Sequence, residues 1–463
     1  MGYSCGKASA YFWKGTHDML FSSIEFLYYY LPAVMLVYFL LPNVLRNGWL
    51  LLARLLFYAW GEPKYVALML TSIILNYVWG LAIGKAQNQS WKRVWLICSI
   101  VTCLGLLGYY KYADFAVENF NAIFGAGLVL PKLALPIGIS FYSFQILSYT
   151  IDVYRGNVES QKNPIDFGCY VALFPQLIAG PIVRYIDVDR ELKKRSTSLE
   201  DFRLGLRRFL MGLGKKILIA NQLGAFVEAF RASGDKSVLF YWLYAIGFSL
   251  HIYFDFSGYS DMAIGLGRIF GFHFLENFNY PFISKSIQEF WRRWHMTLGG
   301  SRCSKAKWLR NTLFVWMFTG LWHGAAWNFV LWGLMFAALL LIEKFVPALQ
   351  KLPDWVRHTY VLILVAISFV LFNATSMAQA AGDIAGMLGL GGVPLVTKAT
   401  LYYLRSYLAV FVVGIIGSLP VMKKVGLKVN NPVLETLAMI ALLLLCTASL
   451  VDGSFNPFLY FRF

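Results

Sequence analysis

The sequence predicts an all-α polytopic membrane protein, and three observations support this fold class. Of the 463 residues, 58% are hydrophobic and only 14% are charged, too few charges to cover a water-soluble protein of this size. Apolar stretches long enough to cross a bilayer recur along the chain. Lys and Arg outnumber Asp and Glu by 41 to 24, and the excess lies between the apolar stretches, as expected for cytoplasmic segments. This pattern argues against nucleic-acid binding, because no basic soluble domain carries the charge.

A transmembrane helix needs about 20 mostly apolar residues. In chain order, the stretches of this kind are 24–42, 49–62, 64–84, 94–112, 133–152, 168–183, 207–230, 238–256, 258–272, 308–330, 331–346, 357–374, 400–420 and 432–451. Several are short or are interrupted by Gly or Pro, which is tolerated at membrane depth only inside protein or beside a wet cavity. We therefore expect roughly eleven to thirteen transmembrane helices, plus some re-entrant or interfacial helices.

Four basic clusters lie between these stretches and should be cytoplasmic. They are Lys85–Arg93, a longer connection at Arg184–Lys216, Lys285–Arg310 and Lys423–Lys428. The segment PQLIAGP (175–181) introduces a kinked break before the second cluster.

The chain contains no internal repeat and no soluble domain, so residues 19–463 are expected to form a single transmembrane domain. Residues 1–18 match nothing that follows, and we expect an N-terminal extension with Met19 as the natural start. The six cysteines form no C-x-x-C pair and are expected to be small buried hydrophobic residues. His273 and His323 lack carboxylate or Cys companions at metal-ligand spacing, so no metal site is expected.

Ionisable groups inside a membrane body are costly, and each is therefore a functional candidate. His323 lies in GLWHGAAWNFVLWG (320–333), where Gly320 and Gly324 allow a backbone or a ligand to approach it and Trp322 and Trp327 can form aromatic walls. One interpretation is a core histidine that donates a hydrogen bond to a carbonyl. The other is a proton-transfer group, which the density of polar residues at 254–298 favours.

His295 ends a W-R-R-W-H cluster that also contains Arg292, Arg293 and Trp294. The adjacent guanidiniums should keep His295 neutral. Trp and Arg are typical of residues that anchor a protein at the membrane interface, and Arg also forms bidentate hydrogen bonds with phosphate groups. The cluster is therefore either an anchor at the membrane interface or a binding site for a phosphate-rich ligand.

Asp255 and Asp261 flank Ser257–Ser260, and three interpretations stay open for them. The carboxylates can act as general acid and base, form the ion site of a transporter, or cap a break in the helix. Asn279 lies in a segment that suggests a turn, and its side chain is also suited to position a substrate.

Five motifs, read together, resemble the membrane-bound O-acyltransferase family. They are MLFSSIEFLYYYLP (19–32), LPIGISFYSFQILSYTIDVYRG (135–156), LFPQLIAGPIVRY (173–185), the polar segment 254–298 and GLWHGAAWNFVLWG (320–333). The core motifs fall within 135–346, and they are closest to the branch of the family that acetylates alginate. The resemblance implies a ring of helices around a central funnel, with His323 as the catalytic histidine and His295 as the second, auxiliary one.

The resemblance also implies an enzyme that moves an acyl group, most simply acetyl, from a cytoplasmic thioester such as acetyl-CoA to a hydroxyl beyond the membrane. Arg292 and Arg293 would attract the donor's phosphates, while Asn279, Trp294, Trp322 and Asp255 would contribute to substrate binding. The acceptor is expected to be an envelope polysaccharide or a partner protein that relays the group outward. The expected location is the bacterial plasma membrane, and no permanently bound cofactor is expected.

Other functions stay open. D-alanyl transfer toward teichoic acid is a variant within the family, and a transporter or a non-catalytic scaffold of an export complex lies outside it. One departure bears on activity: Leu298 is joined directly to Gly299-Gly300-Ser301, where family members usually carry an additional W-F-R-D-Y-like stretch. We expect either a structural break between Leu298 and Gly299 or weakened donor binding.

Overall fold

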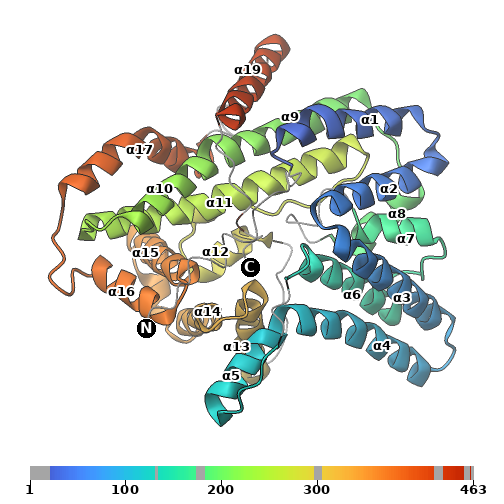
Figure 1. The fold of residues 1–463 in the computed structure, drawn as a ribbon, viewed down its shortest axis with the longest axis horizontal. Helices are drawn as coiled ribbons and strands as arrows, with labels where there is room; N and C mark the ends of the chain where they lie inside the picture. Colours follow the sequence, from blue (N-terminus) through green and yellow to red (C-terminus); the bar gives the residue numbers. More distant parts are fainter. Residues whose placement is uncertain are drawn as a thin grey trace. The chain divides into compact units, whose positions relative to one another are not determined.

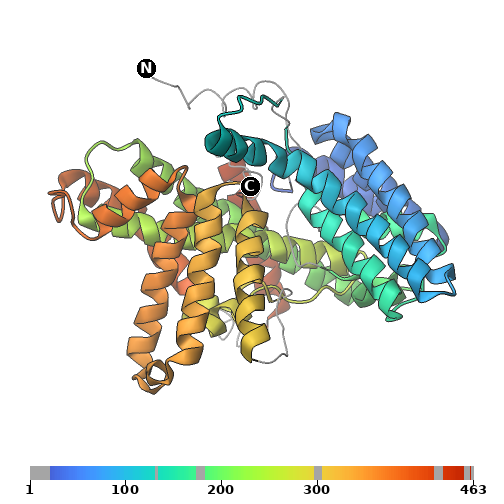
Figure 2. The ribbon, with the colours of Figure 1, turned by 90° about the horizontal axis from the view of Figure 1, so that it is seen from below.

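The computed structural model describes residues 21–130, 134–173, 183–296, 305–421, 431–452 and 459, and the regular elements in these ranges are helices. The one strand-like pairing among them is an isolated antiparallel bridge between Phe278 and Trp294. The predicted all-α fold is therefore confirmed (Figures 1 and 2). The proposed extension at 1–18 and the junction between Leu298 and Gly299 lie outside the described residues.

The chain forms two compact units, of which the first combines the chain up to Cys103 with Ile146–Phe174. Its helices are η1 (Phe26–Tyr30), α1 (Leu31–Leu40), α2 (Asn43–Gly61), η2 (Pro63–Tyr65), α3 (Val66–Lys85) and α7 (Pro164–Val171). The boundary between the units falls within α4 (Gln89–Leu107) and α6 (Ile139–Arg155). Buried polar contacts join three of these helices, since Ser99 Oγ lies 2.7 Å from Asn76 Oδ1 and 3.0 Å from Thr150 Oγ1.

The second unit combines Leu104–Gln145 with the chain from Pro175 onward and contains every candidate site residue. Its helices are η3 (Gly108–Tyr112), α5 (Ala113–Phe124), α8 (Tyr185–Lys193), α9 (Leu199–Gly214), η4 (Lys215–Ala220), α10 (Asn221–Ala232), α11 (Val238–Ile269), η5 (Pro281–Ile283), α12 (Ile287–Arg293), α13 (Lys305–His323), α14 (Trp327–Phe345), η7 (Pro347–Lys351), α15 (Asp354–Asn373), α16 (Met377–Met387), α17 (Lys398–Gly417) and α19 (Pro432–Val451).

Seven helical segments in the described ranges are long and apolar enough to cross a membrane. They are Pro63–Lys85, Gln89–Phe124, Val238–Ile269, Trp327–Phe345, Asp354–Asn373, Lys398–Gly417 and Pro432–Val451. In α11, 72% of the apolar window is buried within the protein, against 6% in α19. Thus α11 is a core helix, whereas α19 presents its apolar surface outward as a lipid-facing helix would. The predicted multi-pass membrane organisation is confirmed.

The predicted division of α11 is wrong. The sequence predicts separate segments at 238–256 and 258–272, but Val238–Ile269 is one uninterrupted helix of 32 residues. The glycines serve its packing against α9, which lies beside it in Figure 1. A Cβ on Gly258 would lie 2.8 Å from Gly212 O, and one on Gly265 would lie 2.5 Å from Gly205 O. Small residues here let two helix backbones touch, so they mark a helix–helix contact rather than a break.

The boundary between α13 and α14 also differs from the prediction. The sequence predicts adjacent spans at 308–330 and 331–346, whereas α13 ends at His323 and α14 begins at Trp327. The two helices form a tight hairpin (Figure 2). A Cβ on Gly320 would lie 2.2 Å from Phe329 O, and one on Gly333 would lie 2.1 Å from Trp316 O. This close approach places His323 at a helix end rather than within a span.

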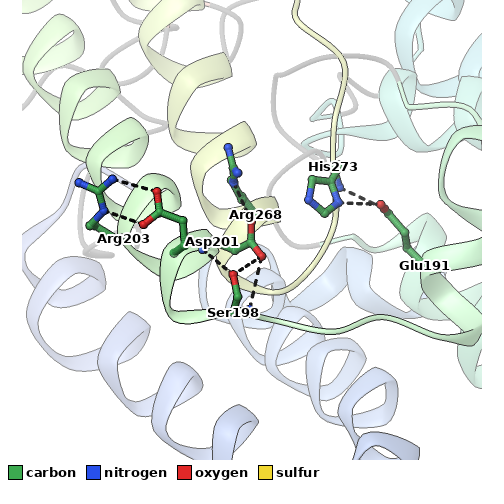
Figure 3. Close-up of polar contacts among 7 residues, drawn as sticks. Glu191, Ser198, Asp201, Arg203, Arg268 and His273 are labelled. Atoms are coloured by element: carbon green, nitrogen blue, oxygen red, sulfur yellow. Dashed lines mark hydrogen bonds and ion pairs between the residues drawn. The ribbon is translucent and has the colours of Figure 1, made fainter. Parts of the chain in front are cut away.

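The Arg184–Lys216 segment was expected to be a long polar connection, but it contains α8 and α9. The Ser198 hydroxyl begins α9 by accepting the Asp201 N–H at 3.0 Å. Arg268, near the end of α11, binds the Asp201 carboxylate at 3.1 Å (Figure 3). The Ser198 hydroxyl and the Arg268 guanidinium together hold the pKa of Asp201 below its usual value. These contacts tie the polar ends of α9 and α11 together.

A second set of polar contacts fixes the segment that follows α11. The Glu191 carboxylate on α8 accepts the His273 backbone N–H at 3.1 Å and lies 2.8 Å from His273 Nδ1 (Figure 3). His273 is exposed and serves this structural contact.

Candidate active site

His323 ends α13 and is enclosed by aromatic rings. Its side chain is buried, and its imidazole centroid lies 4.9 Å from that of Trp322, 5.1 Å from Trp332 and 5.2 Å from Phe372. A Cβ on Gly320 or on Gly324 would clash with Phe329 of α14. These glycines therefore allow α14 to pack closely, rather than a ligand to approach. The imidazole is therefore held by three different helices, α13, α14 and α15.

His295 is held by an unusual backbone conformation. It follows α12 with φ 52°, and non-glycine residues adopt this left-handed region only where the surrounding structure enforces it. The enforcing contacts are the bridge between Phe278 and Trp294, the Asn279 N–H donating to Arg293 O at 2.9 Å, and the Met296 N–H donating to Asn277 O at 3.0 Å. This short ladder directs His295 into the protein interior, where it is 5% exposed.

The two histidines come together in the second unit. Ring contacts link the two regions, because Trp291 on α12, shortly before His295, lies 5.7 Å from Trp332, and Trp332 lies 5.1 Å from His323. His295 packs edge-on against Phe256 of α11 at 5.2 Å. Burial lowers the pKa of His295 to about 3, so it is neutral at physiological pH. The predicted neutrality therefore has burial as its cause, and not the neighbouring guanidiniums.

The two predicted tryptophans border the histidine pair. Trp294 is buried and its ring lies 5.4 Å from Phe369 on α15, one turn before the Phe372 that contacts His323. The Trp322 ring contacts His323 directly. The structure thus brings together His323, His295, Trp294 and Trp322.

The polar residues beside α12 have different positions. Arg293 donates to Glu289 at 2.9 Å and to Asn279 O at 3.2 Å, so its guanidinium stabilises the ladder below His295. Arg292 and the Asn279 side chain are exposed. Of the two arginines predicted to attract a donor, Arg292 is the one whose guanidinium is presented outward.

Asp255 does not join the histidines. One of its oxygens binds Lys216 Nζ at 2.5 Å, and the other accepts the Leu459 N–H at 2.8 Å. Both oxygens are therefore engaged in a contact that holds η4 and the C-terminal region to α11. The structure favours a structural role over the predicted substrate contact.

Asp261 is likewise paired, with Lys215 Nζ and Arg208 Nη2 each at 2.6 Å. Two carboxylates that already have cationic partners make a poor ion-transport site, which weakens the transporter hypothesis. Within the described ranges, no group of three or more His, Cys, Asp or Glu side chains is arranged to hold a metal ion.

Sequence analysis missed three residues around His323. Lys111 and Tyr112 donate hydrogen bonds to the carbonyls of Trp322 and Leu321, the latter at 2.9 Å. Trp332 contacts the imidazole, and its buried indole N–H has no acceptor in the described part of the chain. Lys111 could have been found from the sequence, because it is a charged residue inside the apolar stretch 94–112. A charge within a membrane-spanning stretch needs a functional or structural reason.

Fold and site together define a class: a multi-pass membrane protein whose interior holds two buried histidines among aromatic side chains. The chain belongs to the membrane-bound O-acyltransferase family, whose characteristic sequence matches residues 64–379. The resemblance seen in the sequence motifs is confirmed, and the chain is an O-acyltransferase.

Three bacterial relatives illustrate the range of this similarity. A probable alginate O-acetylase of Azotobacter vinelandii is 38% identical over 502 aligned residues, which cover 96% of this chain and 100% of the relative. A peptidoglycan O-acetyltransferase of Helicobacter pylori is 34% identical over 427 residues, covering 81% of each chain. A teichoic acid D-alanyltransferase of Bacillus subtilis is 30% identical over 264 residues, covering 51% of this chain and 67% of the relative.

Proposed function

We propose that this protein transfers an acetyl group from a cytoplasmic thioester to a hydroxyl of an extracytoplasmic envelope polysaccharide, directly or through a relay protein. The observation that carries the proposal is the presence of two buried imidazoles, those of His323 and His295, in the interior of an O-acyltransferase. The names of the relatives that cover most of the chain favour acetyl as the acyl group and an envelope polymer such as alginate as the final acceptor. The bacterial plasma membrane is the proposed location.

In the proposed reaction, His323 acts as general base. It accepts the proton of the acceptor hydroxyl while the oxygen attacks the thioester carbonyl. A C–O bond forms, the C–S bond breaks, and the proton passes to the departing thiolate to give a free thiol. A positioned base of this kind contributes about 10²–10⁴-fold to the rate. His295, neutral and buried, positions the reacting groups.

The proposed donor is acetyl-CoA, used as a substrate and not held as a permanent cofactor. Arg292 is exposed beside the ladder that holds His295, where it can bind the phosphate groups of the donor. Asn279 is exposed in the same ladder and is proposed to assist. A D-alanyl carrier is the competing donor, suggested by the relative that covers about half of this chain.

The test uses inverted membrane vesicles that contain the protein together with its envelope partners, supplied with radiolabelled acetyl-CoA. Wild-type vesicles should incorporate label into envelope polysaccharide, whereas His323→Gln should lose at least about 100-fold of the incorporation rate. The His273→Gln variant serves as the matched control and should retain the wild-type rate, because the His273 imidazole is exposed and contacts Glu191 on α8.

Incorporation by His323→Gln at the wild-type rate would overturn the general-base assignment. Label incorporated from a D-alanyl carrier but not from acetyl-CoA would overturn the acetyl assignment while leaving the histidine chemistry in place.

A further inference from the structure

A half-buried lysine, Lys111, lies in the second half of the apolar segment Gln89–Phe124, which is long enough to cross a membrane. Lys111 belongs to η3, a π-helical turn between α4 and α5, and its side chain reaches α13. An ammonium group in this setting is costly unless a specific partner compensates for its lost hydration. Single π-helical turns are frequent at functional sites.

The partner of Lys111 is the end of the helix that carries His323. Its ammonium donates to the Trp322 carbonyl, and the hydroxyl of Tyr112 donates to the Leu321 carbonyl at 2.9 Å. The last four carbonyls of an α-helix have no partner within the helix, and they carry the negative end of its dipole. Since water is scarce at membrane depth, these two side chains supply donors that solvent would otherwise provide.

The same part of the chain also holds the other side of the turn after His323. Phe115 on α5 packs its ring 5.8 Å from Trp327, the first residue of α14. The Trp327 indole N–H donates to Asn119 Oδ1 at 2.9 Å. The segment η3–α5 therefore binds both ends of the connection between α13 and α14.

Aromatic packing extends this restraint to the imidazole. The rings of Phe141 and Phe144 meet Trp322 edge-on at 5.6 and 6.1 Å, and the Trp322 ring contacts His323. The carbonyl of Trp322 is thus held by Lys111, and its ring is held by α6. The ammonium is also near enough to act electrostatically on the His323 imidazole.

We propose that Lys111 and Tyr112 are positioning residues for the reaction. They hold the C-terminal carbonyls of α13 and thereby orient His323 toward the reacting hydroxyl. This inference rests on the proposed role of His323 as general base. It goes beyond that role because it assigns a function to a charged side chain outside the histidine pair.

The test compares Lys111→Met, Lys111→Arg and Tyr112→Phe in the vesicle assay, with initial rates measured against acetyl-CoA concentration. A misplaced catalytic group costs roughly 10- to 100-fold. We therefore expect Lys111→Met to lower kcat by that factor with the KM for acetyl-CoA unchanged. Lys111→Arg should recover most of the rate, because it restores a cation that can donate to the Trp322 carbonyl. Tyr112→Phe should lower kcat severalfold.

Lys85→Met at the exposed end of α3 and Tyr109→Phe on the exposed side of η3 are the matched controls and should keep the wild-type rate. Wild-type kcat in Lys111→Met and Tyr112→Phe would overturn the inference. So would a Lys111→Met protein that only unfolds while Tyr112→Phe keeps full kcat. His323→Gln is measured in parallel: if it alone is inactive, the inference fails and the proposed function stands, whereas an active His323→Gln removes the proposed function itself.

Discussion

At the residue scale, His295 combines a strained backbone with an interior imidazole. Its φ of 52° costs of order 1–3 kcal/mol for a residue with a side chain. We expect His295→Gly to retain the fold, since glycine adopts this conformation freely, and to lower acetyl transfer by about 10-fold or more through loss of the imidazole. His295→Val should lose the same activity and also melt at a lower temperature, because a β-branched residue is poorly tolerated at positive φ.

These two effects are separated by measuring thermal unfolding of the purified protein in detergent beside transfer in vesicles. Full activity of His295→Gly would show that the backbone ladder matters and the imidazole does not. A melting temperature for His295→Val equal to that of the glycine variant would remove the argument from strain.

The sequence was sufficient to identify the candidate histidines, but not the contacts that position them. His323 and His295 stand out as ionisable groups among aromatic residues, and both lie in the interior. The positive φ of His295 depends on a ladder between Asn277–Asn279 and Arg293–Met296, a pairing that no local pattern indicates. Lys111 is likewise an ionisable residue in an apolar stretch, but its partner, the Trp322 carbonyl, lies more than 200 positions away in the chain.

At the scale of helices, close backbone contact fixes the hairpin that carries His323. A methyl group on Gly333 would lie 2.1 Å from Trp316 O, so α13 and α14 would have to separate. We expect Gly333→Ala to lower the free energy of unfolding by about 1–3 kcal/mol and to reduce transfer, because overpacking displaces the backbone that ends at His323. Gly382→Ala in α16 is the control, since a Cβ there meets nothing within 4 Å and should be neutral or stabilising by about 0.4–1 kcal/mol.

Thermal unfolding and vesicle transfer of the two alanine variants provide the comparison. If Gly333→Ala matched Gly382→Ala in both measurements, the hairpin would tolerate separation and the close contact would not position His323.

The buried pair Lys216–Asp255 links η4 to α11 and offers a second test at this scale. Lys216→Met leaves the Asp255 carboxylate without its cation, and breaking a buried pair in this way costs about 3–5 kcal/mol. The double variant Lys216→Met with Asp255→Leu should recover much of that loss, since it removes both charges. If the pair is structural, the double variant should also transfer acetyl groups at a rate close to that of the wild type.

A double variant that is stable but inactive would contradict this expectation and would return Asp255 to the substrate site, as its sequence context first suggested. Unfolding is measured in detergent and activity in vesicles, so that stability and catalysis are read independently.

At the scale of the whole molecule, composition and hydropathy were sufficient for the fold class, but not for the boundaries of its helices. Apolar windows at 64–84, 357–374 and 432–451 correspond closely to α3, α15 and α19. The predicted helix break near Gly258 is wrong because this glycine allows close contact with α9. Local sequence does not distinguish a glycine needed for such a tertiary contact from one that ends a helix. The polar character of the basic segment 184–216 predicts a connection, yet α8 and α9 are amphipathic helices whose apolar sides are buried.

The orientation of the chain in the membrane follows from basic residues combined with helix connectivity. The basic segment around Arg292 is expected on the cytoplasmic side. Lys285 binds Asp354, so the chain before α12 lies at the same end as the start of α15. Helix α15 is long and apolar enough to cross the bilayer, so we expect Asn373 at the opposite face. Since α16 has only 11 residues and cannot cross, the connection that contains Leu395 stays on that face.

This arrangement predicts opposite labelling of two exposed positions. In a background with the six native cysteines replaced by serine, Lys285→Cys should react with a membrane-impermeant maleimide in inverted vesicles and resist it in intact spheroplasts. Leu395→Cys, at a side chain 76% exposed, should show the reverse pattern. Reaction of both residues from one side would mean that α15 does not cross the bilayer. Reaction of Lys285→Cys from outside alone would place the start of this basic segment away from any cytoplasmic thioester, and the donor would then have to approach His295 from a different part of the protein.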